Sequence, residues 1–175
     1  MSKGKIVLLL AILIALIAPF WAAASGALGL LTGPVALISA GLYVANGCNV
    51  KNGLKITLGF LAGNVWAYFV MLCMGALAPN IGFSPYLLLF IVLFVFVIVA
   101  VFIASYLDKI FDLSAWLSGW AVTLTIMNLS THDQLTLLWQ IAVAMVAGVW
   151  FVGVLITSTH KYLVGKASKN KQSAK

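Results

Sequence analysis

Hydroxyl and amide side chains recur at helical spacing inside long apolar stretches of this sequence. Two stripes can be traced, one made of Thr32, Ser39 and Asn46 and the other of Ser118, Thr125 and Asn128. Residues seven positions apart return to nearly the same face of a helix, so each stripe marks one face. Such groups form a ladder of donors and acceptors that replaces the hydration water of a passing solute. The alternative for any single Ser or Thr is a hydrogen bond to its own helix or to a neighbouring helix.

Asn64 is the strongest single candidate for a functional residue. It lies about a third of the way along an apolar stretch, where a buried amide needs a hydrogen-bonding partner or water. We expect it to face a path shared with the two stripes. Pro34 removes a backbone donor, and it either kinks its helix or breaks it at a binding site. Trp66 and Trp120, together with Trp150, lie deep enough to form an aromatic constriction.

The sequence shows no arrangement typical of an enzyme. The two histidines, His132 and His160, are expected in a loop and at the end of a helix, too far from Ser118 to activate it. Cys48 and Cys73 are expected near opposite ends of their helices, so we predict neither a disulfide nor a metal site. We therefore expect no catalysis and no cofactor.

The composition indicates that membrane helices position these residues. The chain has 175 residues, of which 64% are hydrophobic and 7% charged, whereas soluble domains are about 45–50% apolar and about 25% charged. The apolar stretches lack the alternation of barrel strands, which predicts an all-α integral membrane protein. Six transmembrane helices are expected at Ile6–Ala24, Gly26–Asn46, Ile56–Leu77, Tyr86–Leu107, Leu113–Leu129 and Leu135–Tyr162.

The ten lysines give the expected orientation. With the N-terminus in the cytoplasm, all ten fall on the cytoplasmic side, which predicts that both termini are inside. Residues 1–162 would form the transmembrane domain, and residues 163–175 a basic, disordered tail near anionic lipid headgroups. The start also resembles a signal peptide, with Ala22-Ala23-Ala24 as a cleavage site, but we expect it to remain as the first span. Lysines placed between apolar stretches argue against nucleic-acid binding.

The two halves of the chain share a weak internal repeat. Residues 31–39 align with residues 117–125 at an offset of 86, and residues 61–64 align with 146–149 at an offset of 85. Each half would contain three spans, so the halves would enter the membrane in opposite directions. We therefore predict two inverted three-helix repeats. Chance coincidence among the Gly, Ser and Thr residues common in membrane helices is the alternative.

Four short segments resemble a known family. The segments are Leu30-Leu31-Thr32-Gly33, Ala40-Gly41-Leu42-Tyr43-Val44-Ala45, Lys51-Asn52-Gly53-Leu54-Lys55 and Gly63-Asn64-Val65-Trp66-Ala67. They resemble the YcdZ-like family of small bacterial inner-membrane proteins, a domain of unknown function. This resemblance implies a bacterial inner membrane and supplies no established activity.

The absence of charged residues well inside any span narrows the expected function. Proton or sodium coupling normally uses an intramembrane carboxylate, and charged substrates usually need a countercharge. We therefore expect a passive channel or facilitator for a small neutral or weakly polar solute, in the class of urea, amides, ammonia or small amines. The alternative is a non-transporting membrane protein with an assembly or regulatory role. The unbroken apolar surface of Tyr86–Leu107 predicts a homo-oligomer.

Overall fold

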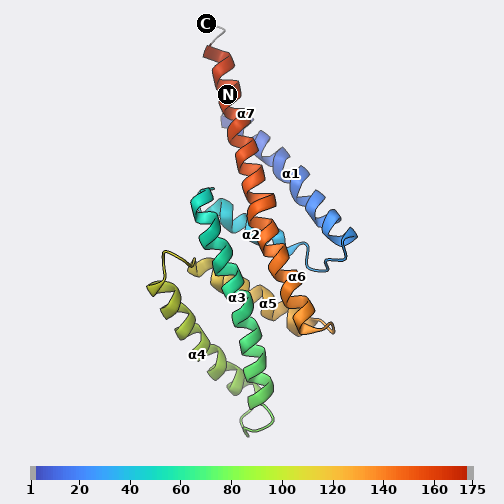
Figure 1. Ribbon diagram of the computed structural model, residues 1–175, viewed down its shortest axis with the longest axis vertical. Coiled ribbons are helices and arrows are strands. Elements are labelled where there is room, and N and C mark those ends of the chain that lie inside the picture. Colours follow the sequence, from blue (N-terminus) through green and yellow to red (C-terminus); the bar gives the residue numbers. More distant parts are fainter. Residues whose placement is uncertain (1–2, 173–175) are drawn as a thin grey trace.

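A computed structural model describes the backbone of residues 3–172 and the side chains of residues 4–166, and all regular structure in that range is helical. Figure 1 shows the helices in chain order. They are α1 (Lys3–Ala27), α2 (Val35–Ala45), α3 (Val50–Leu77), α4 (Pro85–Tyr106), α5 (Leu113–Leu129), α6 (Gln134–Ala147), the π-helix η1 (Gly148–Val154) and α7 (Leu155–Gln172). Because α6, η1 and α7 follow one another without a break, residues 3–172 form six helical segments.

Side-chain caps fix the starts of four helices. Asn49, Ser84, Asp112 and Asp133 each accept a hydrogen bond from a backbone N–H in the first turn of α3, α4, α5 and α6, respectively. Such a cap satisfies one of the donors that a helix leaves free at its N-terminus. The apolar stretches that follow therefore begin as helices at defined residues.

The second expected span is wrong in its first part. Residues 28–34 form turns, and α2 begins only at Val35. Gly29 has a φ of +75°, and Gly33 packs against Ser25 where no Cβ fits. Pro34 stands immediately before α2 with a φ of −60°, so its missing N–H interrupts no helix, and it neither kinks nor breaks one.

Four helices are long and apolar enough to cross a membrane. They are Gly4–Ala27, Val50–Leu77, Pro85–Tyr106 and the continuous run Gln134–Lys166. α2 has 11 residues and thus a length of about 16 Å, about half of a hydrocarbon core of about 30 Å. α5 has 17 residues, at the lower limit of about 17–25 for a spanning helix. The six expected spans are thus four long helices and two shorter ones.

The C-terminal segment also differs from the expectation. Where the sequence predicts a tail without structure from residue 163, α7 continues as a helix to Gln172. The last three residues of that tail lie outside the described residues.

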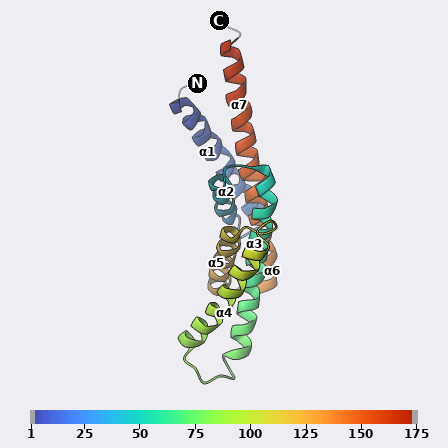
Figure 2. The same ribbon diagram turned by 90° about the vertical axis from the view of Figure 1, so that its left-hand side faces the viewer.

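Close backbone contacts organise the packing. α3 crosses α5 where Gly63 lies against the backbone of Trp116 and Trp120. η1 crosses α2 where Gly148 lies against Ala36 and Ser39. α1 packs on α7, and α4 packs on α3. Seen edge-on, α2 and α5 lie on one side of α3 and the α6–α7 run (Figure 2).

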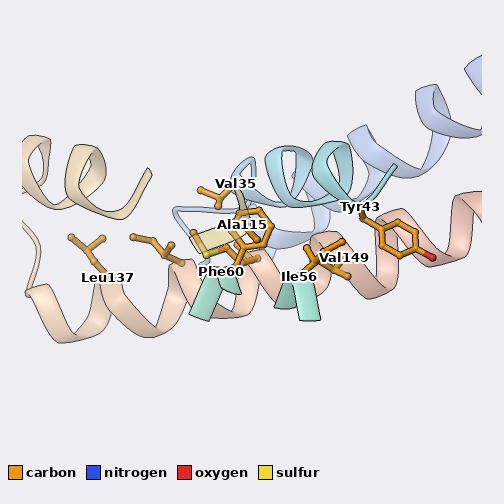
Figure 3. Packing of buried hydrophobic residues seen from close by; sticks show 10 residues of the cluster. Val35, Tyr43, Ile56, Phe60, Ala115, Leu137 and Val149 are labelled. Atoms are coloured by element: carbon orange, nitrogen blue, oxygen red, sulfur yellow. The ribbon is translucent and has the colours of Figure 1, made fainter. Parts of the chain in front are cut away.

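The central apolar cluster joins all the inner helices. It contains Val35 and Tyr43 of α2, Ile56 and Phe60 of α3, Ala115 of α5, Leu137 of α6 and Val149 of η1, together with further residues of α6. Figure 3 shows Leu137 and Tyr43 at opposite ends of this cluster. The cluster holds α2 and α5 against α3 and against the continuous helix formed by α6 and η1.

Candidate membrane cavities between α2 and α5

Asn64 lies at the junction of three helices. Its side chain is 2% exposed. Its Nδ2 donates to the carbonyl oxygen of Leu138 in α6 at 2.8 Å, and its Oδ1 accepts from Thr123 Oγ1 in α5 at 2.8 Å. The amide is therefore satisfied by neighbouring helices, and Asn64 lines none of the cavities described below. Thr123 lies in the repeated segment 117–125, but the sequence pattern does not single it out, because its spacing does not place it on the second polar stripe.

Three of the six stripe residues hydrogen-bond to backbone carbonyls of their own segments. Ser39 donates to the carbonyl oxygen of Ala36, Asn46 to that of Leu42, and Thr125 to that of Ala121. Ser39 is buried beside Gly148, whereas Asn46 is exposed beyond the end of α2. Ser118 is half-buried on α5. These residues do not gather around one common path, and their role as pore-lining residues stays a prediction.

The tryptophans do not form the expected constriction. Trp66 packs edge-on against Trp116 with ring centroids 5.6 Å apart, and its Nε1 donates to the carbonyl oxygen of Phe96. Trp120 is buried in a cluster with residues of α3 and α4, and Trp66 packs against the same cluster. Trp150 is partly exposed, and its Nε1 donates to Thr57 Oγ1. Trp150 thus packs apart from Trp66 and Trp120, and the three do not form one ring.

Two adjoining cavities lie between α2 and α5. The first, which we call the α2–α5 groove, has a volume of about 400 Å³ and is lined by Pro34, Val35, Ile38, Ala121, Val122, Thr125 and Ile126. The second, the loop cavity, has a volume of about 270 Å³ and is lined by Leu31, Thr32, Pro34, Val35, Ile126, Ser130, His132 and Leu137. The two share Pro34, Val35 and Ile126, so they lie side by side. Three of the predicted site residues, Thr32, Pro34 and Thr125, line this pair.

Thr32 is the distinctive polar residue of the loop cavity. Its side chain is 5% exposed, and its Oγ1 has no hydrogen-bond partner among the described residues. The turn that contains Thr32 is held from two sides, because Trp21 Nε1 donates to the carbonyl oxygen of Gly33 and the Leu31 N–H donates to Gln140 Oε1. The backbone is anchored and the hydroxyl remains unpaired.

Asn128 lines a third cavity, away from the other stripe residues. This cavity has a volume of about 460 Å³ and lies between the ends of α3, α4 and α5. Met71, Met74, Tyr86 and Gln134 are among its other lining residues. Over the described part of the chain, no group of three His, Cys, Asp or Glu residues is placed to hold a metal ion.

These features define a helical protein whose described part has four helices of membrane-spanning length and two shorter helices packed against them. The chain belongs to the family described as "Protein of unknown function (DUF1097)", whose model matches residues 11–160. The family match agrees with the resemblance to a domain of unknown function, and the narrower YcdZ-like name stays a prediction. Comparison with curated proteins and with solved structures finds no match.

Proposed function

We propose that the protein is a passive membrane facilitator for a small neutral or weakly polar solute. The route would run through the loop cavity and along the α2–α5 groove. The observation that carries the proposal is that the two cavities adjoin at Pro34, Val35 and Ile126. Non-helical backbone within a membrane is tolerated where it is buried in protein or lines a cavity, and the turn before α2 meets that description.

The chemistry of the walls favours a neutral solute. The described residues that line the two cavities include no Asp, Glu, Lys or Arg. A charged solute would lose its hydration in this surrounding without gaining a countercharge, whereas a neutral solute loses much less. Urea, amides, ammonia and small amines remain the proposed class.

The membrane and orientation are part of the same proposal. We place the protein in a bacterial inner membrane with both termini in the cytoplasm. The lysine distribution supports this orientation, because all ten lysines then lie inside. In this orientation the loop cavity opens to the outside.

The packing supports two inverted repeats, residues 3–77 and 85–172. α1 packs on α7 as α4 packs on α3, and η1 crosses α2 as α3 crosses α5. Figure 1 shows α1 and α4 on opposite flanks and running in opposite directions. A twofold relation between the halves would place the α2–α5 groove on its axis, where substrate sites of inverted-repeat transporters lie. The groove is open along one side, so a second copy of the chain would complete its wall, consistent with a homo-oligomer.

Solute flux into proteoliposomes tests the proposal. Vesicles that contain the protein should admit urea or acetamide faster than protein-free vesicles. Ala121→Trp should return the rate to background, because the new ring fills the groove at an exposed position of α5. Ala15→Trp, an equal change at an exposed position of α1, should retain full flux.

The second candidate is a non-transporting membrane protein with an assembly or regulatory role. It is favoured by the internal pairing of Asn64 with Thr123 and Leu138, because this network connects helices instead of facing a solute path. Correctly folded protein that leaves vesicle permeability at background for every solute of the class would reject the facilitator and retain this candidate.

A further inference from the structure

The loop cavity contains an unpaired hydroxyl in an otherwise satisfied environment. A buried hydroxyl without a partner is unfavourable, because it has given up its hydrogen bonds to water. Thr32 Oγ1 is in this state, whereas the neighbouring backbone N–H of Leu31 is bonded to Gln140. The neighbouring hydroxyls of Ser39 and Thr125 are also bonded, each to its own helix. A molecule bound in the loop cavity can therefore supply the hydrogen-bond partner that this hydroxyl lacks.

Two further polar residues line the same cavity. Ser130 Oγ accepts a hydrogen bond from the backbone N–H of His132 at 3.1 Å, which leaves the hydroxyl proton of Ser130 free to be donated. His132 also lines the cavity, and its imidazole can both donate and accept hydrogen bonds when neutral. The carboxylate next in sequence, Asp133, caps α6 by accepting from the Thr136 N–H. The remaining walls are apolar.

We infer that the loop cavity is a binding site for a primary carboxamide or urea, held through Thr32, Ser130 and His132. A carboxamide carries an acceptor oxygen and N–H donors on one small planar group, which matches three side chains that lie in one cavity and can both donate and accept. The volume of about 270 Å³ accommodates a small organic molecule and exceeds what ammonia needs. This inference rests on the proposed function, since the cavity is one end of the proposed route.

A solute without N–H groups should bind less well. A site built to hydrogen-bond its ligand discriminates strongly against an analogue that lacks the matching group, because buried polar atoms are then left unpaired. Acetone has nearly the shape of acetamide but no N–H, so it serves as the matched ligand. Ammonium chloride and ethanol serve as two further control ligands, the first for a small cation and the second for an alcohol.

Histidine NMR provides a direct measure of binding. The chain has two histidines. His132 lines the cavity, whereas His160 lies on α7 with its Nε2 at 3.1 Å from the carbonyl oxygen of Ile6. With ring-labelled full-length protein in micelles at fixed pH, acetamide should shift the His132 signals in a saturable manner and leave those of His160 in place. Acetone, ethanol and ammonium chloride should produce no saturable shift.

Thr32→Val separates binding through the hydroxyl from general solvent effects. The substitution keeps the branched shape and removes Oγ1, and it should raise the acetamide concentration for half-saturation at least about five-fold, the effect of one lost hydrogen bond. Thr131→Val, in the same loop but outside the lining, should leave the titration unchanged.

The outcomes distinguish this inference from the proposed function. Absence of a saturable His132 shift with acetamide, an equal shift with acetone, or an unchanged titration in Thr32→Val would overturn the carboxamide site, even if vesicles containing the protein admit solutes. Saturable binding that depends on Thr32, in a protein that gives no flux, would retain the site and overturn the facilitator.

Discussion

The amide of Asn64 shows how a single side chain connects elements that are distant in sequence. Its donor and its acceptor are both used, at 2.8 Å each, and they join α3 to α6 and to α5. A buried amide must be hydrogen-bonded, and these bonds form only when the three helices hold the partner atoms within reach. This network therefore specifies the relative position of the three helices. Because both ends of the amide bond to other protein groups, we expect Asn64 to contribute to the stability of the fold.

Asn64→Leu should therefore lower stability and leave transport per folded molecule unchanged. The change removes two hydrogen bonds and leaves Thr123 Oγ1 without its acceptor, at an expected cost of about 1–3 kcal/mol in the free energy of unfolding. Unfolding by SDS in mixed micelles, followed by tryptophan fluorescence, measures this cost. Asn128→Leu, at an exposed amide, should have a much smaller effect. Full stability with lost flux would show that Asn64 acts on the solute after all.

The sequence could indicate that Asn64 needs a partner, but not which one. The expense of burying an amide follows from the apolar residues around it. Its partners Leu138 and Thr123 are 74 and 59 residues away, and only the packing of α3 against α5 and α6 brings them within reach. Thr32 was found by its spacing on a helical face, although it lies in a turn. Its importance comes from the cavity, which no periodicity reveals.

At the scale of elements, hydropathy locates most of the helices well but misses the turn before α2. The expected span Leu113–Leu129 coincides with α5, and Tyr86–Leu107 differs from α4 by one residue at each end. Capping residues such as Ser84 and Asp112 mark these boundaries in the sequence. The turn at residues 28–34 is itself apolar, so composition does not distinguish it from a membrane helix. Its conformation depends on Gly29 and on contacts with α1.

The crossing of α3 and α5 should depend on one glycine. A Cβ at Gly63 would overlap backbone atoms of Trp116 and Trp120, so Gly63→Ala must separate the helices, at a cost of about 1–3 kcal/mol. Gly75, on the same helix, has open space around it, and Gly75→Ala should be neutral or stabilising by up to about 1 kcal/mol. Thermal unfolding of both variants in the same detergent checks the contrast. Equal melting temperatures would contradict the close crossing.

At the scale of the whole molecule, the distribution of charge and the packing of the helices agree with one proposed arrangement in the membrane. In the proposed orientation all ten lysines lie on the cytoplasmic side, and α1 packs on α7 as α4 packs on α3. The two shorter helices pack against the longer ones, and in the proposed membrane placement the turn before α2 and the groove beside α5 lie within the bilayer. If α3 spans the membrane, the loop between α3 and α4 must lie on the opposite side from the loop between α2 and α3.

Cysteine labelling at these two loops should report opposite sides of the membrane. In a Cys48→Ser, Cys73→Ser background, a cysteine at Asn80 should react with an impermeant maleimide added to intact cells, because residue 80 follows the end of α3. A cysteine at Asn52 should react only after the membrane is opened, because residue 52 lies in the first turn of α3, beside Lys51 and Lys55. α3 has 28 residues and a length of about 42 Å, enough to separate the two positions by a bilayer. Labelling of both positions from the same side would rule out α3 as a spanning helix, and the reverse accessibility would overturn the cytoplasmic placement of the termini.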